Sequence, residues 1–151
     1  MEPKQDPRMV LVEKFSKFQP IILGFVLLAY VGITQKWPYA GIALIISVGL
    51  LAQLYILRAN FYIDMSWTSG ERLMHRITFF SLAIGLAAFL FHLQSWPGWE
   101  LLSMISIMAF TMIFLFLVMK KVAITKYLSL IELSSMLLIF IHFMRVYIER
   151  I

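Results

Sequence analysis

The feature that most constrains this chain is a short motif that occurs twice, each time between two long apolar runs. The copies are Gln35-Lys36-Trp37-Pro38 and Gln94-Ser95-Trp96-Pro97, and at the same spacing of 59 residues Ser47 aligns with Ser106. Self-similarity at a fixed spacing identifies a repeated structural unit. The sequence therefore predicts a helical hairpin that is duplicated within the chain.

Composition places these hairpins in a membrane. The chain is 62% hydrophobic and 14% charged, with a mean hydropathy of +0.88, whereas soluble domains carry about 25% charged residues. The net charge is +5, but the positive residues are spread between the apolar runs, so we expect a lipid bilayer and no nucleic acid as partner. The lack of cysteine excludes disulfides, thiol catalysis and Cys-ligated metals.

The apolar runs divide the chain into five parts. Leu11, Phe15 and Phe18 follow a helical spacing that predicts an amphipathic leader lying on the lipid headgroups. The expected parts are a cytoplasmic leader (1–19), a first transmembrane hairpin (20–57), a cytoplasmic loop (58–76), a second hairpin (77–119), and a short loop with a last transmembrane helix (120–151). The predicted fold class is all-α: a polytopic transmembrane helical bundle of two tandem parallel hairpin repeats plus a fifth helix, with an N-terminal interfacial amphipathic helix.

Charge predicts the orientation of the bundle. With a cytoplasmic N-terminus, ten of the thirteen lysines and arginines lie inside, and only Lys36, Arg145 and Arg150 lie outside. Positive loops remain on the cytoplasmic side, so we expect a multi-pass protein of the cell inner (cytoplasmic) membrane with its C-terminus outside. A four-crossing arrangement, in which the last helix lies on the surface, stays open.

Ordinary turn chemistry explains the repeated motif. Gln35 and Gln94 end apolar spans, and Trp37 and Trp96 are suited to the headgroup layer. A proline is tolerated in the first turn of a helix, so Pro38 and Pro97 are expected to begin the next helices. We interpret the motif as a structural turn rather than a ligand site.

A hairpin whose turn carries such a Trp-Pro motif resembles the N-terminal membrane hairpin of the GldL family of Bacteroidetes gliding-motility and type IX secretion motor proteins. The matching stretches are Ile33 to Gly41 and Phe91 to Gly98. That family has one hairpin followed by a long cytoplasmic tail, whereas two hairpins are expected here. The family's membrane glutamate, implied in proton coupling, has no counterpart in these stretches.

Glu132 is the first candidate for a functional site, because a charge inside a membrane is expensive to keep. It lies near the start of the last apolar run, with Ser135 and His142 on a similar helical face. One interpretation is a proton-relay or ion-binding carboxylate. The other is an ion pair with Lys120, Lys121 or Lys126 of the preceding loop, in which case Glu132→Gln should be tolerated.

The second candidate is a group of side chains expected at one depth on the outer side. It consists of His92, Glu100 and His142, joined by Gln94 and Arg145. Two imidazoles on facing helices could bind a haem, and an imidazole with a carboxylate could hold a metal or a quinone headgroup. Their spacing matches no metal motif, and each residue also fits an ordinary interfacial or helix-terminal role. We therefore predict no cofactor and no metal.

The sequence indicates the function of the protein only in outline. The sequence contains no Gly-x-Ser-x-Gly or His-Glu-x-x-His motif and no paired aspartates, so we expect no enzyme. We expect a non-enzymatic scaffold or accessory subunit that associates with other membrane subunits or with copies of itself. The alternative is a small transporter or electron-transfer component that uses Glu132 or the group of His92, Glu100 and His142.

Overall fold

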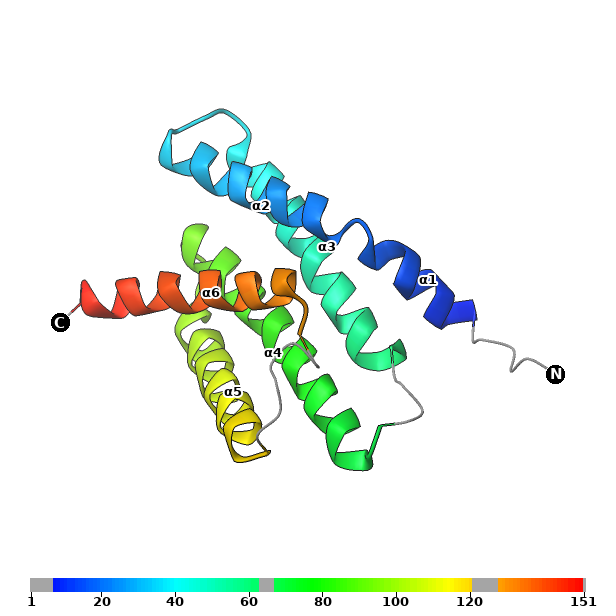
Figure 1. The fold of residues 1–151 in the computed structure, drawn as a ribbon. Helices are drawn as coiled ribbons and strands as arrows, with labels where there is room; N and C mark the ends of the chain where they lie inside the picture. Colours follow the sequence, from blue (N-terminus) through cyan, green and yellow to red (C-terminus); the bar gives the residue numbers. More distant parts are fainter. Residues whose placement is uncertain (1–6, 63–66, 121–127, 151) are drawn as a thin grey trace.

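The computed structural model describes residues 7–62, 67–120 and 128–150, and all regular elements in these ranges are α-helices. They are α1 (Pro7–Ser16), α2 (Gln19–Thr34), α3 (Ala40–Phe61), α4 (Ser69–Leu93), α5 (Trp99–Lys120) and α6 (Leu130–Ile148) (Figure 1). Helices α3 to α6 are each long and apolar enough to cross a membrane. Helices α1 and α2 add a fifth span if the pair, bent by 46°, counts as one. The expected all-α membrane protein is confirmed.

The central helices are longer than hydropathy predicts. α3 continues to Phe61 and α4 already begins at Ser69, so much of the predicted loop 58–76 is helical. A capping box starts α4: the Thr68 hydroxyl accepts a hydrogen bond from the Glu71 N–H, and the Glu71 carboxylate accepts one from the Thr68 N–H. Such a cap stabilises a polar first turn that has no hydropathy signal.

Helix α4 is the centre of the bundle. It packs between α3 and α5, while α2 packs on the other side of α3, as Figure 1 shows. The predicted neighbour pairs α2/α3 and α4/α5 are therefore confirmed. Of the most apolar stretch of α4, 56% is buried, against 22% for α6. Leu82, Leu86 and Phe89 of α4 are fully buried in the core.

Small residues allow α4 and α5 to approach closely. A Cβ atom added at Gly85 would lie 2.6 Å from the Ser106 hydroxyl oxygen and 3.1 Å from two methyl carbons of Ile139. The Ser106 hydroxyl donates a hydrogen bond of 3.2 Å to the Ser81 carbonyl. Close backbone approach with an interhelical hydrogen bond is how helices associate where lipid removes the hydrophobic driving force.

Helix α6 lies across this bundle. In Figure 1 it crosses in front of α4 and α5, and it contacts α2, α4 and α5. Its buried residues share one face: Glu132, Ser135, Ile139 and Phe143. The opposite face is exposed, with Ile141 64% accessible.

The two Trp-Pro turns have the same backbone conformation. Lys36 and Ser95 are both left-handed, with φ of 56° and 55°. The N–H groups of Trp37 and Trp96 each donate a hydrogen bond of 2.8 Å to a carbonyl five residues back. This is a Schellman motif, which satisfies the last carbonyls of a helix. The turns lie at the same end of the bundle, where the Gln94 side chain donates a 3.4 Å hydrogen bond to the Gly41 carbonyl.

The prolines of the turns do not begin the following helices, and this corrects the sequence-based expectation. α3 begins at Ala40 and α5 at Trp99, each two residues after the proline. The residue between them is again left-handed, with φ of 64° at Tyr39 and 88° at Gly98. A positive φ is incompatible with a right-handed helix, so Pro38 and Pro97 belong to the turns.

Candidate functional site

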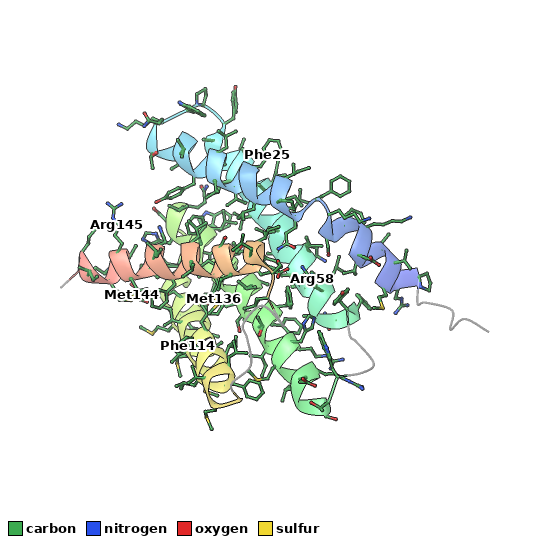
Figure 2. All side chains as sticks on the ribbon, viewed as in Figure 1. Phe25, Arg58, Phe114, Met136, Met144 and Arg145 are labelled. Atoms are coloured by element: carbon green, nitrogen blue, oxygen red, sulfur yellow. The ribbon has the colours of Figure 1, made fainter. Side chains whose placement is uncertain are left out.

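Glu132 is fully buried and forms an ion pair with Arg58 of α3. Figure 2 shows Arg58 where the start of α6 meets α3. The expected lysine partners cannot be compared, because Lys121, Lys126 and the side chain of Lys120 lie outside the described residues. The pair joins the last turn of α3 to the first turn of α6, and it brings no net charge into the bundle.

A chain of hydrogen bonds extends from this pair into the bundle. Arg58 Nη1 donates to Gln19 Oε1 (3.0 Å), and Gln19 Nε2 donates to the Tyr55 hydroxyl (3.2 Å). The Tyr55 hydroxyl lies 2.9 Å from the Ser135 hydroxyl, which donates to the Ile131 carbonyl. Tyr55 therefore donates to Ser135, and every donor in the chain points the same way. We call Arg58, Glu132, Gln19, Tyr55 and Ser135 the ion-pair cluster.

Both oxygens of the Glu132 carboxylate are used. One binds Arg58, and the other accepts the Ser129 N–H in the capping box that begins α6. The Arg58 guanidinium also lies over the Phe79 ring, 4.7 Å from its centroid. Further hydrogen bonds help to retain a buried ion pair. Here they satisfy both carboxylate oxygens of Glu132 and Nη1 of Arg58, whereas the buried Nε of Arg58 has no hydrogen-bond partner among the described residues.

His75 belongs to the surroundings of the ion-pair cluster. Its Nε2 lies 3.3 Å from the Arg58 carbonyl, and its ring is 2% exposed among Trp67, Phe79 and Tyr62. It is thus at the opposite end of α4 from His92. This placement ties the start of α4 to the end of α3.

At the other end of α4, His92 and His142 form a direct hydrogen bond. His92 Nδ1 and His142 Nε2 are 3.0 Å apart. Aromatic rings surround this imidazole pair: Trp99 lies edge-on to His92 at 4.5 Å, and Phe89 edge-on to His142 at 4.7 Å. The two histidines that were expected at one depth are therefore in contact.

Glu100 does not join the imidazole pair. It forms a 2.6 Å ion pair with Arg150, and both side chains are about half exposed. Gln94 binds the Gly41 carbonyl, and Arg145 pairs with Glu149. The described residues contain no group of three His, Asp or Glu side chains that could hold a metal. A haem ligated by both imidazoles would have to stand between them, and the hydrogen-bonded rings leave no space for it.

An apolar layer separates the ion-pair cluster from the imidazole pair. Ser135 and His142 are seven residues apart on α6, which is about 10 Å along a helix. Between them lies Ile139, fully buried against Gly85 and surrounded by the core of α4. Thus the polar side chains on the inner face of α6 form two groups rather than a continuous path.

A groove between α5 and α6 has a volume of about 470 Å³. It is lined by apolar side chains, including Phe114 and Met136, which are labelled in Figure 2. Its one hydroxyl, on Thr111, is bound to the Ile107 carbonyl of its own helix. The groove offers no charged group to a polar substrate.

Sequence reasoning found Glu132, His92 and His142 but missed the partners of Glu132. In the sequence Arg58 is only the first residue of the predicted loop (58–76), and no role is predicted for Gln19 or Tyr55. Two signals were present: the Ser129-x-x-Glu132 spacing of a capping box, and an arginine that directly follows an apolar run.

Comparison of the chain with known protein families, curated proteins and solved structures gives no match.

Proposed function

We propose that this small integral membrane protein is a non-enzymatic scaffold or accessory subunit of a larger complex in the inner membrane. The observation that carries the proposal is the outward face of α5. Met104, Met108, Met112 and Met119 lie along it with exposed fractions of 53%, 69%, 68% and 82%. Flexible, polarizable methionines are over-used on adaptable binding surfaces, and four of the ten in the chain lie here.

The interior supports the same proposal. The carboxylate of Glu132 is held by Arg58 and a backbone N–H, and the hydrogen-bond chain passes through the amide of Gln19, which does not exchange protons as a carboxylate or imidazole does. The apolar layer at Ile139 then interrupts the path of polar side chains toward His142. A helix-joining role accounts for these polar groups without a transported ion. We further propose that the Trp-Pro hairpins share their lineage with the GldL membrane hairpin.

A bulky substitution on the α5 face tests the proposal. Met108→Trp remains compatible with lipid but should block a docked helix, so the native assembly extracted in mild detergent should fall to the mass of the single chain. Ile46→Trp is the matched control on α3, where the exposed fraction of Ile46 is 58%; it should leave the assembly unchanged. A wild-type protein that is extracted only as a single chain would contradict the scaffold.

Transport would be the better conclusion if the protein moved protons across the membrane of reconstituted vesicles. The decisive observation would be proton flux with the wild type that Tyr55→Phe abolishes at equal amounts of folded protein. Tyr55→Phe removes the hydroxyl that joins Gln19 to Ser135 and keeps the ring in the core. A scaffold predicts no flux with either protein.

A further inference from the structure

The C-terminal half of α6 is attached to the bundle by a few aromatic and polar contacts. Beyond Ile139, only Phe143 of this helix is fully buried, and its ring stacks on Trp99, which also contacts Tyr147 and Arg150. The polar contacts are the hydrogen bond between His142 and His92, one of 2.8 Å between Tyr147 and Ser103, and the exposed ion pair of Arg150 with Glu100. An ion pair this exposed contributes little, so the buried contacts matter most.

The contact between the two imidazoles depends on their protonation. A neutral imidazole has one N–H donor and one acceptor nitrogen, whereas a protonated imidazole has two donors. The 3.0 Å contact between His92 Nδ1 and His142 Nε2 needs one hydrogen between the two nitrogens. A neutral pair or a singly protonated pair can supply it. When both rings are protonated, two N–H groups face each other and the hydrogen bond is lost.

Charges around the pair make a second proton costly. The titratable and charged groups near it are Tyr30 on α2, Glu100 on α5, Arg145 and Tyr147 on α6, and Glu149 and Arg150 directly after α6. Both carboxylates in this set are already paired with the two arginines. Two imidazolium rings with centroids 5.0 Å apart would therefore repel each other without a free counter-charge in this set.

We propose that the His92–His142 hydrogen bond is a pH-sensitive latch that releases the C-terminal half of α6 from α4 when both rings are protonated. The latch is closed at neutral and alkaline pH and opens on acidification. The N-terminal half of α6 stays attached through Glu132 and Ser135 of the ion-pair cluster. This device is independent of whether the protein acts as a scaffold or a transporter.

Spin-label distances in the purified full-length protein test the latch. The chain has no cysteine, so labels attach only at Ile141→Cys on α6 and Leu101→Cys on α5, both at exposed positions. Between about pH 8 and about pH 4, a range that extends well below the ordinary imidazole pKa of about 6.5 because the second proton is costly, the distance distribution should shift and broaden. A second label pair at Leu50→Cys and Leu73→Cys, on α3 and α4, should not respond.

The matched variant keeps the hydrogen bond but cannot titrate. An asparagine amide occupies the place of the histidine Nδ1 and a glutamine amide that of Nε2, so His92→Asn/His142→Gln should stay closed at both pH values. His75→Gln, at the other end of α4, should retain the wild-type response. An unchanged wild-type distribution at low pH, or an equal shift in the double variant, would overturn the latch.

If the double variant is already open at pH 8, the single variant His92→Asn decides. It keeps one imidazole and cannot carry two positive charges, so a closed and pH-independent distribution supports the latch. A shift on acidification like that of the wild type contradicts it.

Discussion

Arg58 and Glu132 neutralise each other at a position where neither has ready access to water. Arg58 is 15% exposed and Glu132 is not exposed at all. Removing one partner of a buried pair leaves an uncompensated charge, whereas replacing both is often nearly neutral. A lysine in the loop could have extended its ammonium group to water after loss of the glutamate charge. The buried Arg58 cannot do so.

We accordingly predict that Glu132→Gln is not tolerated, in contrast to the expectation from sequence. It should lower the free energy of unfolding by about 3–5 kcal/mol because Arg58 stays buried without a counter-charge. Arg58→Met/Glu132→Gln should recover most of this loss, since the amide still accepts the Ser129 N–H. Reversible denaturation in detergent, followed by circular dichroism, measures both. Equal losses in the single and the double variant would show that the charge is not the cause.

Gly85 gives a second prediction for a single residue. Gly85→Ala places a methyl group 2.6 Å from the Ser106 oxygen and 3.1 Å from Ile139, so these two side chains must shift away from α4. We expect a loss of about 1–3 kcal/mol, the usual cost of overpacking. Gly49→Ala is the control, because nothing lies within 4 Å of its added methyl group and alanine favours a helix. Thermal melting should give a lower melting temperature for Gly85→Ala than for Gly49→Ala. Similar melting temperatures would count against the close packing of α5 and α6 on α4 at Gly85.

Among the structural elements, the two Trp-Pro turns differ at one informative position. Tyr39 and Gly98 are equivalent and both left-handed, a conformation that glycine adopts without steric cost. Tyr39→Gly should therefore stabilise the first hairpin, and Gly98→Ala should destabilise the second, by about 1 kcal/mol each. Unfolding curves of the two variants measure these opposite changes in stability. Changes in the same direction would refute the assignment of a left-handed conformation to both positions.

The elements also show which structural features hydropathy can locate. Apolar runs predicted the helices and their neighbours, because long stretches of lipid-compatible side chains leave few alternatives. They did not predict the ends of α3 and α4, since the Thr68–Glu71 cap is a local hydrogen-bonding device outside the apolar span. The Schellman turns were missed for a related reason: Lys36 and Ser95 occupy a position where glycine is the usual signal.

At the scale of the whole molecule, both Trp-Pro turns lie at one end of the bundle, and the excess of positive charge predicts that this end faces the exterior. Lys36→Cys and Ser95→Cys should therefore react with an impermeant thiol reagent added outside intact cells, and Ser69→Cys only after the membrane is opened. The lack of native cysteine makes the assay direct. Labelling of the two turns from opposite sides would contradict the arrangement.

The polar interior could be predicted only in part. Glu132, His92 and His142 are visible because charged and imidazole groups are rare in the apolar runs. Their partners depend on how α6 crosses α3 and α4, and a crossing angle leaves no periodic mark in the sequence. The role of Gln19 could not be predicted for another reason: Gln19 is buried where α1 meets α2.

The inner face of α6 also has a consequence for biosynthesis. α6 leaves the ribosome after α1 to α5 and is the least apolar of the four helices that can each span a membrane by themselves. Its buried Glu132 and Ser135 find their partners on α3, which has been translated long before. Entry of α6 into the bilayer is therefore favoured by docking onto helices already inserted, so the order of synthesis matches the order in which the bundle can be built.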